Sequence, residues 1–330
     1  MMRKGYRWQL IGIVMLVLLV VLAGCAPKPA EKEAEEEKPA ETVYLTFSSG
    51  SVGGVYYSLG GAIADTMSRV PGFQCVSEST AASIENCRLV GLGESEFGFA
   101  MNDAAYKAVE GIDPFDEKLP LKALFVVYPA PQHVLTLKGS GIKSVEDMKG
   151  KRVSVDAAGS GCEAMSKEIL KAMGMSYDDI KVAFLSQPEA ATAIKDGNID
   201  ALFWNFAYPG AVVLDVASVR DIELIPLPEE VMDELAAKFP YYRKGKIPGG
   251  TYKGVDEDTP ALEVGNVIVA HEDMDEELAY TITKTLFDNV KSMGEVHPAA
   301  LQMDPETAWK TPIEIHPGAA RYFKEVGTLK

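Results

Sequence analysis

The chain has 330 residues, of which 47% are hydrophobic and 24% charged, and its formal net charge is −16. This length and composition are typical of a globular protein of about two domains, and they exclude a fibrous or wholly disordered chain. The negative charge excludes nucleic-acid binding, because phosphate backbones require clustered lysine and arginine side chains. The four histidines and four cysteines are scattered without the spacing of metal ligands, so we expect no metal site.

The first 25 residues have the layout of a secretory signal. Arg3, Lys4 and Arg7 precede an apolar stretch, Leu10–Leu22, that is too short to span a bilayer as a mature helix. The small residues before Cys25 resemble the lipobox of prokaryotic lipoproteins, which implies removal of residues 1–24 and lipid attachment to Cys25. We therefore expect an extracytoplasmic protein, anchored by lipid to the cell membrane in the periplasm or at the cell surface. An ordinary signal followed by a chance cysteine is the alternative.

The segment that follows Cys25 has the composition of a tether. Residues 26–41 carry three prolines and nine charged side chains, and no aromatic or large aliphatic residue. Such a segment cannot bury enough apolar surface to offset the entropy of ordering it. We expect residues 25–41 to be a disordered acidic tether between a membrane anchor and a globular body.

The globular body opens with the pattern of an α/β unit. Residues 43–47 read as a strand, which runs into a loop rich in glycine and serine and then into a helix. In that helix Leu59, Ile63 and Met67 recur every fourth residue, as one buried face requires. A strand, a Gly/Ser loop and a helix N-terminus in this order begin an α/β fold.

The same pattern returns in the second half of the chain. Residues 152–155 read as a strand, residues 157–162 as a Gly/Ser loop, and the following helix ends at Gly174. Two further segments, 90–99 and 193–203, both read as a helix end, a glycine turn, an acidic residue and a strand. These echoes predict two lobes of similar construction.

The later segments predict how the two lobes are connected. Residues 121–127 and 134–137 read as extended and are interrupted by prolines, and residues 263–270 form another extended run. A long helix is predicted from about Asp275 to Met293, because apolar residues recur along one face. A chain that leaves near residue 129 and returns near residue 268 would form a cleft with a hinge. We expect lobe 1 to comprise residues 42–128 and 268–330, and lobe 2 to comprise residues 129–267.

The two Gly/Ser loops are candidates for binding an anion. Each precedes a helix N-terminus, where backbone N–H groups lack partners and the helix dipole is positive, so a carboxylate can bind without lysine or arginine. The alternative is that glycine and serine merely form tight turns. Neither loop has a phosphate-binding or dinucleotide-binding motif, so we expect no ATP, NAD or other cofactor.

The cysteines give little support for catalysis. Cys162 is at a helix start, where a thiol pKa can fall, but His133 is only a distant candidate base. Ser160 lacks the surroundings of a nucleophile elbow. We therefore expect a protein that is not an enzyme. A disulfide between Cys75 and Cys87 is permitted outside the cytoplasm, and two buried free thiols are the alternative.

Six segments of the chain form an ordered set of motifs. They are 49–61 (SGSVGGVYYSLGG), 83–89 (SIENCRL), 99–106 (FAMNDAAY), 144–155 (SVEDMKGKRVSV), 159–161 (GSG) and 316–322 (HPGAARY). Together they resemble the motifs of the TAXI family of TRAP-transporter solute receptors, and the likeness extends over residues 43–327.

The resemblance implies an α/β, type II periplasmic-binding-protein fold, in which two α/β lobes joined by a two-strand hinge enclose a ligand cleft. It implies a monomeric receptor that traps a small organic anion outside the cell and delivers it to the subunits of an ion-driven TRAP permease. The anion would be a dicarboxylate, a keto acid or an acidic or polar amino acid. A surface lipoprotein that senses the ligand and signals to a membrane receptor is the alternative.

Matched residue by residue, the resemblance also implies a ligand-binding set: Ser49, Gly50, Gly54, Tyr56, Ser83, Asn86, Asn102, Ser160, Gly161, Cys162 and Tyr208. Three places differ from the family pattern. Residues 81–83 read Ala-Ala-Ser instead of Gly-Gly-Ser, Cys162 replaces a threonine, and residues 204–206 (Trp-Asn-Phe) are bulkier. These differences bear on the identity of the ligand rather than on the fold.

Overall fold

The structure is a computed structural model that describes residues 42–330, which form one compact unit. The predicted signal peptide, the lipidation of Cys25 and the acidic tether lie outside the described residues. Within residues 42–330, every helix is too short or too polar to cross a bilayer.

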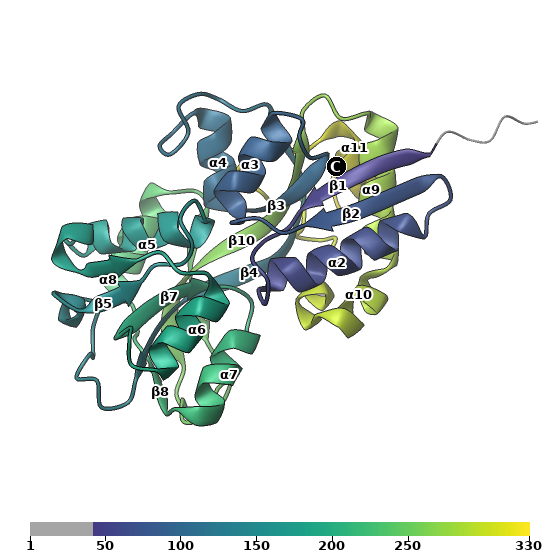
Figure 1. Cartoon of the computed structure of the whole chain (residues 1–330). Coiled ribbons are helices and arrows are strands. Elements are labelled where there is room, and N and C mark those ends of the chain that lie inside the picture. The colour runs from purple at the N-terminus through teal and green to yellow at the C-terminus, as the bar shows by residue number, and fades with distance from the viewer. Residues whose placement is uncertain (1–41) are drawn as a thin grey trace, which may run out of the picture. The chain divides into compact units, whose positions relative to one another are not determined.

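Two mixed β-sheets share one long strand, β4 (Figure 1). The order across both sheets is β2-β1-β3-β10-β4-β7-β5-β6, with β8 paired to β4 and β9 to β10. The strands are β1 (Val43–Ser48), β2 (Phe73–Glu78), β3 (Phe97–Met101), β4 (Leu121–Leu137), β5 (Arg152–Ser154), β6 (Lys181–Ala183), β7 (Ala201–Asn205), β8 (Ile222–Leu224), β9 (Tyr242–Ile247) and β10 (Thr259–His271).

Strands β4 and β10 each belong to both halves of the molecule. Residues 121–131 of β4 pair with β10, and residues 132–137 pair with β7 and β8. Strand β10 pairs with β9 through residues 259–264 and with β3 through residues 266–270. We call the half built on β1, β2 and β3 lobe 1, and the half built on β5 to β9 lobe 2. The predicted α/β fold of two lobes joined by two strands is confirmed.

Helices cover both faces of each sheet (Figure 1). In lobe 1, α2, α9, α10 and α11 pack into one core, and α3 and α4 into another. In lobe 2, α6 and α7 pack into the first of these cores, which is continuous through both lobes, and α5 and α8 pack into a third. The helices are α2 (Val55–Ser68), α3 (Ser83–Gly91), α4 (Asn102–Glu110), α5 (Gly161–Ala172), α6 (Gln187–Lys195), α7 (Ala211–Val219), α8 (Glu229–Lys238), α9 (Glu276–Asp288), α10 (Val290–Val296) and α11 (Pro317–Glu325), with 3-10 turns η1 (Glu146–Met148), η2 (Tyr177–Asp179) and η3 (Pro298–Gln302).

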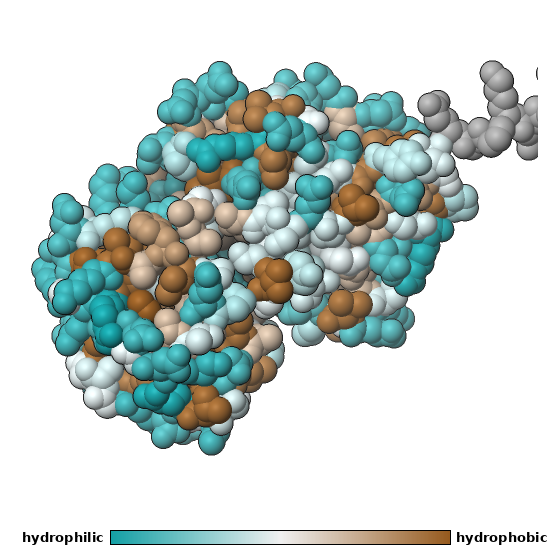
Figure 2. Space-filling model, viewed as in Figure 1, coloured by the Kyte–Doolittle hydropathy of each residue, from teal (hydrophilic) through white to brown (hydrophobic). Residues whose placement is uncertain are grey.

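The apolar periodicity identifies the buried faces correctly. Leu59, Ile63 and Met67 of α2 are at most 2% exposed and pack in the core of lobe 1. On the face shown in Figure 2, hydrophilic residues predominate and hydrophobic residues form separate patches. Most of the apolar residues that the patterns assign to helix faces and strands are therefore buried inside the lobes.

The matching segments 90–99 and 193–203 share one hydrogen-bonding arrangement. Glu96 Oε2 accepts a hydrogen bond from Thr46 N at 2.5 Å, and Asp200 Oδ2 accepts one from Arg152 N at 2.8 Å. Each acidic residue precedes a strand and binds the backbone of the neighbouring parallel strand, β1 or β5. The similar construction predicted for the lobes is therefore confirmed at these positions.

Two predictions about local structure are wrong. Strand β4 continues through Pro129 and Pro131 without a break, because both prolines pair with β10 alone and pairing with β7 begins only at Gln132, so fewer N–H donors are needed there. The single helix predicted from Asp275 to Met293 is two helices, α9 and α10, which meet at Asn289. The Asn289 side chain donates to Thr285 O at 2.8 Å, an interaction that competes with continuation of the helix.

The disulfide considered for Cys75 and Cys87 is absent, and both residues are buried free thiols. Cys75 packs with α2 and α9 on one side of the lobe 1 sheet, whereas Cys87 packs with α4 on the other. Because the sheet lies between these cores, the two sulfur atoms cannot approach bonding distance.

Candidate functional site

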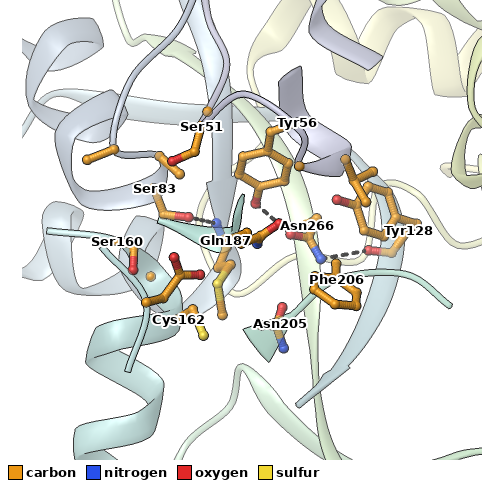
Figure 3. A pocket seen from close by; sticks show the side chains of 18 residues that line it. Ser51, Tyr56, Ser83, Tyr128, Ser160, Cys162, Gln187, Asn205, Phe206 and Asn266 are labelled. Carbon is orange, nitrogen blue, oxygen red and sulfur yellow. Dashed lines mark hydrogen bonds between the residues drawn. The ribbon is translucent and has the colours of Figure 1, made fainter. Parts of the chain in front are cut away.

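A pocket lies between the two lobes and is lined by 18 residues (Figure 3). Its cavity volume is about 50 Å³. A buried water needs roughly 10–15 Å³ of such volume, so the pocket can hold several water molecules. Seven residues of the predicted ligand-binding set line it: Gly50, Gly54, Tyr56, Ser83, Ser160, Gly161 and Cys162.

Four helices, two from each lobe, begin at this pocket. In lobe 1, α2 starts after Gly54 and α3 starts at Ser83, and neither helix has a side-chain cap. In lobe 2, α5 starts at Gly161 and α6 at Gln187. First-turn N–H groups without side-chain caps are donors for a bound anion, and the four helix dipoles all favour negative charge there.

The α5 terminus is partly capped from within its own lobe. Ser160 Oγ accepts a hydrogen bond from Glu163 N at 3.0 Å. The α6 terminus has a capping box, in which Glu189 Oε2 accepts from Ser186 N at 2.9 Å. The termini without a side-chain cap therefore belong to lobe 1, at α2 and α3.

Tyr56 connects α2 with the hinge strand β10. Its hydroxyl donates to Asn266 Oδ1 at 2.5 Å, and Asn266 Nδ2 donates to Tyr128 O of β4 at 3.4 Å (Figure 3). The Tyr56 ring stacks on Phe99, with ring centroids 4.4 Å apart. Burial raises the pKa of the Tyr56 hydroxyl, so it stays a neutral donor. Pocket, helix and both hinge strands thus form one hydrogen-bonded unit.

Asp156 is the charged residue of the pocket lining. It follows β5, is 5% exposed and has a φ of 77°. Its Oδ1 accepts from Ala157 N at 2.8 Å. Burial raises the pKa of its carboxyl from 3.8 to about 6, so the group is mainly ionised at neutral pH.

Cys162 lies in a setting that disfavours its thiolate form. Gln132 Nε2 donates to its sulfur at 3.5 Å, and burial raises the pKa of the thiol well above its usual value. His133 bonds Tyr252 Oη at 2.9 Å, and burial lowers its pKa to about 4. The pocket therefore has a protonated thiol with a neutral histidine engaged elsewhere, which is not a nucleophile–base pair.

Two predicted site residues do not line the pocket but bind the backbone of the lobe 1 strands next to it. Asn86 is fully buried, and its Nδ2 donates to the carbonyl oxygens of Ser49 at 2.7 Å and Phe99 at 2.8 Å. Ser49 is also fully buried and donates to Glu78 O at 2.5 Å. Both residues lie outside the pocket lining, and they hold the ends of β1, β2 and β3 in register.

Asn102 and Tyr208 also lie outside the lining. Asn102 lines a separate groove of about 700 Å³ beside the hinge strands, and its Oδ1 accepts from Thr311 Oγ1 at 3.4 Å. Tyr208 is 38% exposed, and Phe206, two residues earlier, lines the pocket instead.

Several lining residues were missed by sequence reasoning. Asp156 follows β5 and Asn205 is the last residue of β7, and the ends of parallel strands are a general signal for ligand contacts. Asn266 in β10 and Tyr128 in β4 carry no local signal, because they reach the pocket only through the pairing of the hinge strands.

An α/β fold of two lobes joined by two strands, with a polar pocket between them, is the fold of the periplasmic solute-binding proteins. The chain belongs to the NMT1-like family, whose model matches residues 47–327.

Individual relatives are distant. An aliphatic sulfonates-binding protein of Escherichia coli (strain K12) is 30% identical over 86 residues, which are 26% of this chain and 27% of that protein. The match thus spans about a quarter of the relative's length. A solved structure from Bordetella bronchiseptica has a TM-score of 0.52 at 16% identity and covers 87% of this chain and 89% of that one. The periplasmic aliphatic sulphonate binding protein of Escherichia coli has a TM-score of 0.47 at 15% identity, covering 88% and 80%.

Proposed function

We propose that this protein is an extracytoplasmic solute receptor that traps a small organic acid between its lobes and passes it to a membrane permease. The observation that carries the proposal is the meeting of four helix N-termini, two from each lobe, at one small pocket. The absence of a nucleophile–base pair at the lining favours binding over catalysis.

The proposed mechanism is a hinged trap. Each lobe holds part of the binding groups, so a ligand contacts both sets only when the lobes are closed. Its affinity is then higher for the closed form, and binding shifts the population toward that form by this difference. The Tyr56–Asn266 hydrogen bond lies at the hinge, where it couples the pocket wall to β10.

We further propose delivery to an ion-driven TRAP permease. This proposal rests on the resemblance of the six sequence motifs to those of TRAP-transporter receptors. Lipid on Cys25 and the tether of residues 26–41 would hold the receptor near the membrane and raise its effective concentration at the permease. The protein would thus work at the outer face of the cell membrane.

Ligand binding is tested by thermal unfolding of protein that was first unfolded and refolded to remove any bound ligand. The panel is small organic acids: dicarboxylates, keto acids, amino acids and sulfonates. A ligand at 100 times its Kd stabilises the folded form by about 2.7 kcal/mol, which gives a clear shift in Tm. If every acid leaves Tm unchanged, the proposed function is wrong.

Delivery is tested with the receptor and its cognate permease in proteoliposomes. Uptake driven by an ion gradient supports a TRAP permease, whereas uptake that needs ATP contradicts it. Cys25→Ser tests the anchor, and we expect this variant to leave the membrane fraction while keeping its ligand affinity.

A further inference from the structure

The charge of the pocket is opposite to what an anion receptor would be expected to carry. The lining contains one formally charged residue, Asp156, and neither lysine nor arginine. A simple dicarboxylate would therefore place one carboxylate near the helix N-termini and a second one in a pocket that already holds a buried negative charge. The second carboxylate of the ligand and the Asp156 carboxylate would repel each other, and the low dielectric of a buried site strengthens the repulsion.

Asp156 occupies its position despite an unfavourable backbone conformation. In residues 42–330, two residues other than glycine have positive φ, Ala82 at 80° and Asp156 at 77°, and both line this pocket. Residues with a strained backbone persist where the surrounding structure holds them in place, and they cluster at functional sites. A glycine would adopt the same backbone without strain, so the carboxyl group itself is the feature that distinguishes this position.

Two further acceptors at the pocket have no donor within the described part of the chain. Gln187 Oε1 and Asn205 Oδ1 are buried, and both residues line the cavity. The Asn205 amide nitrogen donates to Ala130 O at 3.1 Å. The amide oxygen therefore points away from Ala130, toward the centre of the pocket (Figure 3). Buried acceptors without donors are costly, and a ligand that brings N–H groups would satisfy them.

We infer that the ligand carries a protonated nitrogen, held by Asp156 with the side-chain oxygens of Gln187 and Asn205, beside an acid group held at the helix N-termini. This selects an amino-acid-like zwitterion over the corresponding keto acid, hydroxy acid or dicarboxylate. The inference rests on the proposed function, because it names the ligand class of the same pocket.

The test compares matched pairs of compounds that differ in the amine. Stripped full-length protein is titrated by calorimetry at pH 7.5 with glycine and glycolate, L-alanine and pyruvate, L-glutamate and 2-oxoglutarate, and taurine and isethionate. We expect the amine of at least one pair to bind ten times more tightly than its partner, or better. Asp156→Asn keeps the size of the side chain and should remove this preference by at least tenfold.

Two further variants keep the test interpretable. Asp156→Gly relieves the backbone strain and should fold at least as well as the natural chain, so loss of amine preference in it cannot result from misfolding. Asp196→Asn makes the same charge change at an exposed position after α6, and it should bind like the natural chain.

The outcomes separate this inference from the proposed function. Equal or tighter binding of the compound without the amine, or an amine preference that survives in Asp156→Asn, overturns the inference and leaves a receptor for simple acids. If the stripped protein binds no compound of any pair, the proposed function fails and the inference fails with it.

Discussion

Gly161, the first residue of α5, lies directly against Ser83, the first residue of α3. A Cβ atom built on Gly161 would be 2.8 Å from Ser83 Oγ and 2.7 Å from Met101 Sδ. Real side chains essentially never approach this closely, so the contact between lobe 2 and lobe 1 depends on the missing side chain. The first turn of α5 reaches the pocket because residue 161 is glycine.

We therefore predict that Gly161→Ala holds the lobes apart. Its φ is not positive, so alanine adds no backbone strain and the variant should fold normally. Ligand affinity should fall about tenfold, which corresponds to about 1.4 kcal/mol, and the radius of gyration with ligand should exceed that of the natural chain. Gly61→Ala is the matched control, since a Cβ there has no neighbour within 4 Å. Unchanged affinity in Gly161→Ala would contradict this role.

A buried ion pair joins the lobes away from the pocket. Lys107 Nζ of α4 lies 2.6 Å from Glu168 Oε1 of α5, and Tyr242 Oη donates to Glu168 Oε2 at 2.7 Å. We predict that Glu168→Gln lowers the free energy of unfolding by roughly 2 kcal/mol, because it removes the carboxylate in direct contact with buried Lys107 and leaves Asp103 as its nearby negative charge. Denaturant unfolding measures the loss. The double variant with Lys107→Met should recover part of it, and a loss that is not recovered would show that the pair itself is not the cause.

Tyr56→Phe removes one hydroxyl from the pocket wall. Asn266 Oδ1 then loses its donor, and we expect the free energy of unfolding to fall by about 1–2 kcal/mol. Ligand affinity should fall as well, because the contact lies at the hinge. Tyr57→Phe is the control: Tyr57 is 43% exposed, and its change should stay within about 0.5 kcal/mol. Equal effects of the two substitutions in denaturant unfolding would refute the role of this hydrogen bond.

The buried carboxyls of Asp103 and Asp156 should stabilise the unliganded protein as the pH falls from 7.5 toward 5, whereas buried His133, whose pKa is lowered to about 4, acts in the opposite direction over the same range. Burial raises the pKa of both Asp103 and Asp156 from 3.8 to about 6. The folded form then binds protons more tightly than the unfolded form, so the stability associated with each carboxyl is present below pH 4 and lost as the pH rises through 6. Each accounts for roughly 2–3 kcal/mol at most. Chemical denaturation of the natural chain and of Asp103→Asn/Asp156→Asn across this range isolates the two carboxyls, because His133 contributes equally to both proteins. We expect the natural chain to gain stability relative to the double variant as the pH falls, and a difference that stays constant or shrinks would contradict the assignment.

Local patterns predicted the strands and helices on either side of the two Gly/Ser loops, because helix and strand periodicity depends on residues near each other in the chain. The α2 face, the glycine turn before β7 and the start of a helix at about Asp275 were all readable in this way. The prolines of β4 and the break at Asn289 were misjudged, since their outcome depends on a change of strand partner and on a side-chain bond to Thr285.

For the pocket, residue patterns alone established that two Gly/Ser loops precede helices and that motifs recur in order. It did not show that Asn86 holds three strands from behind, or that Asn266 and Tyr128 reach the pocket from the hinge. Nor did it show that Asp156 is the charge inside. Those facts were decided by tertiary structure, because the charge and donors that a ligand meets are set by which distant strands pair and which helix ends converge, and these contacts have no signature in neighbouring residues.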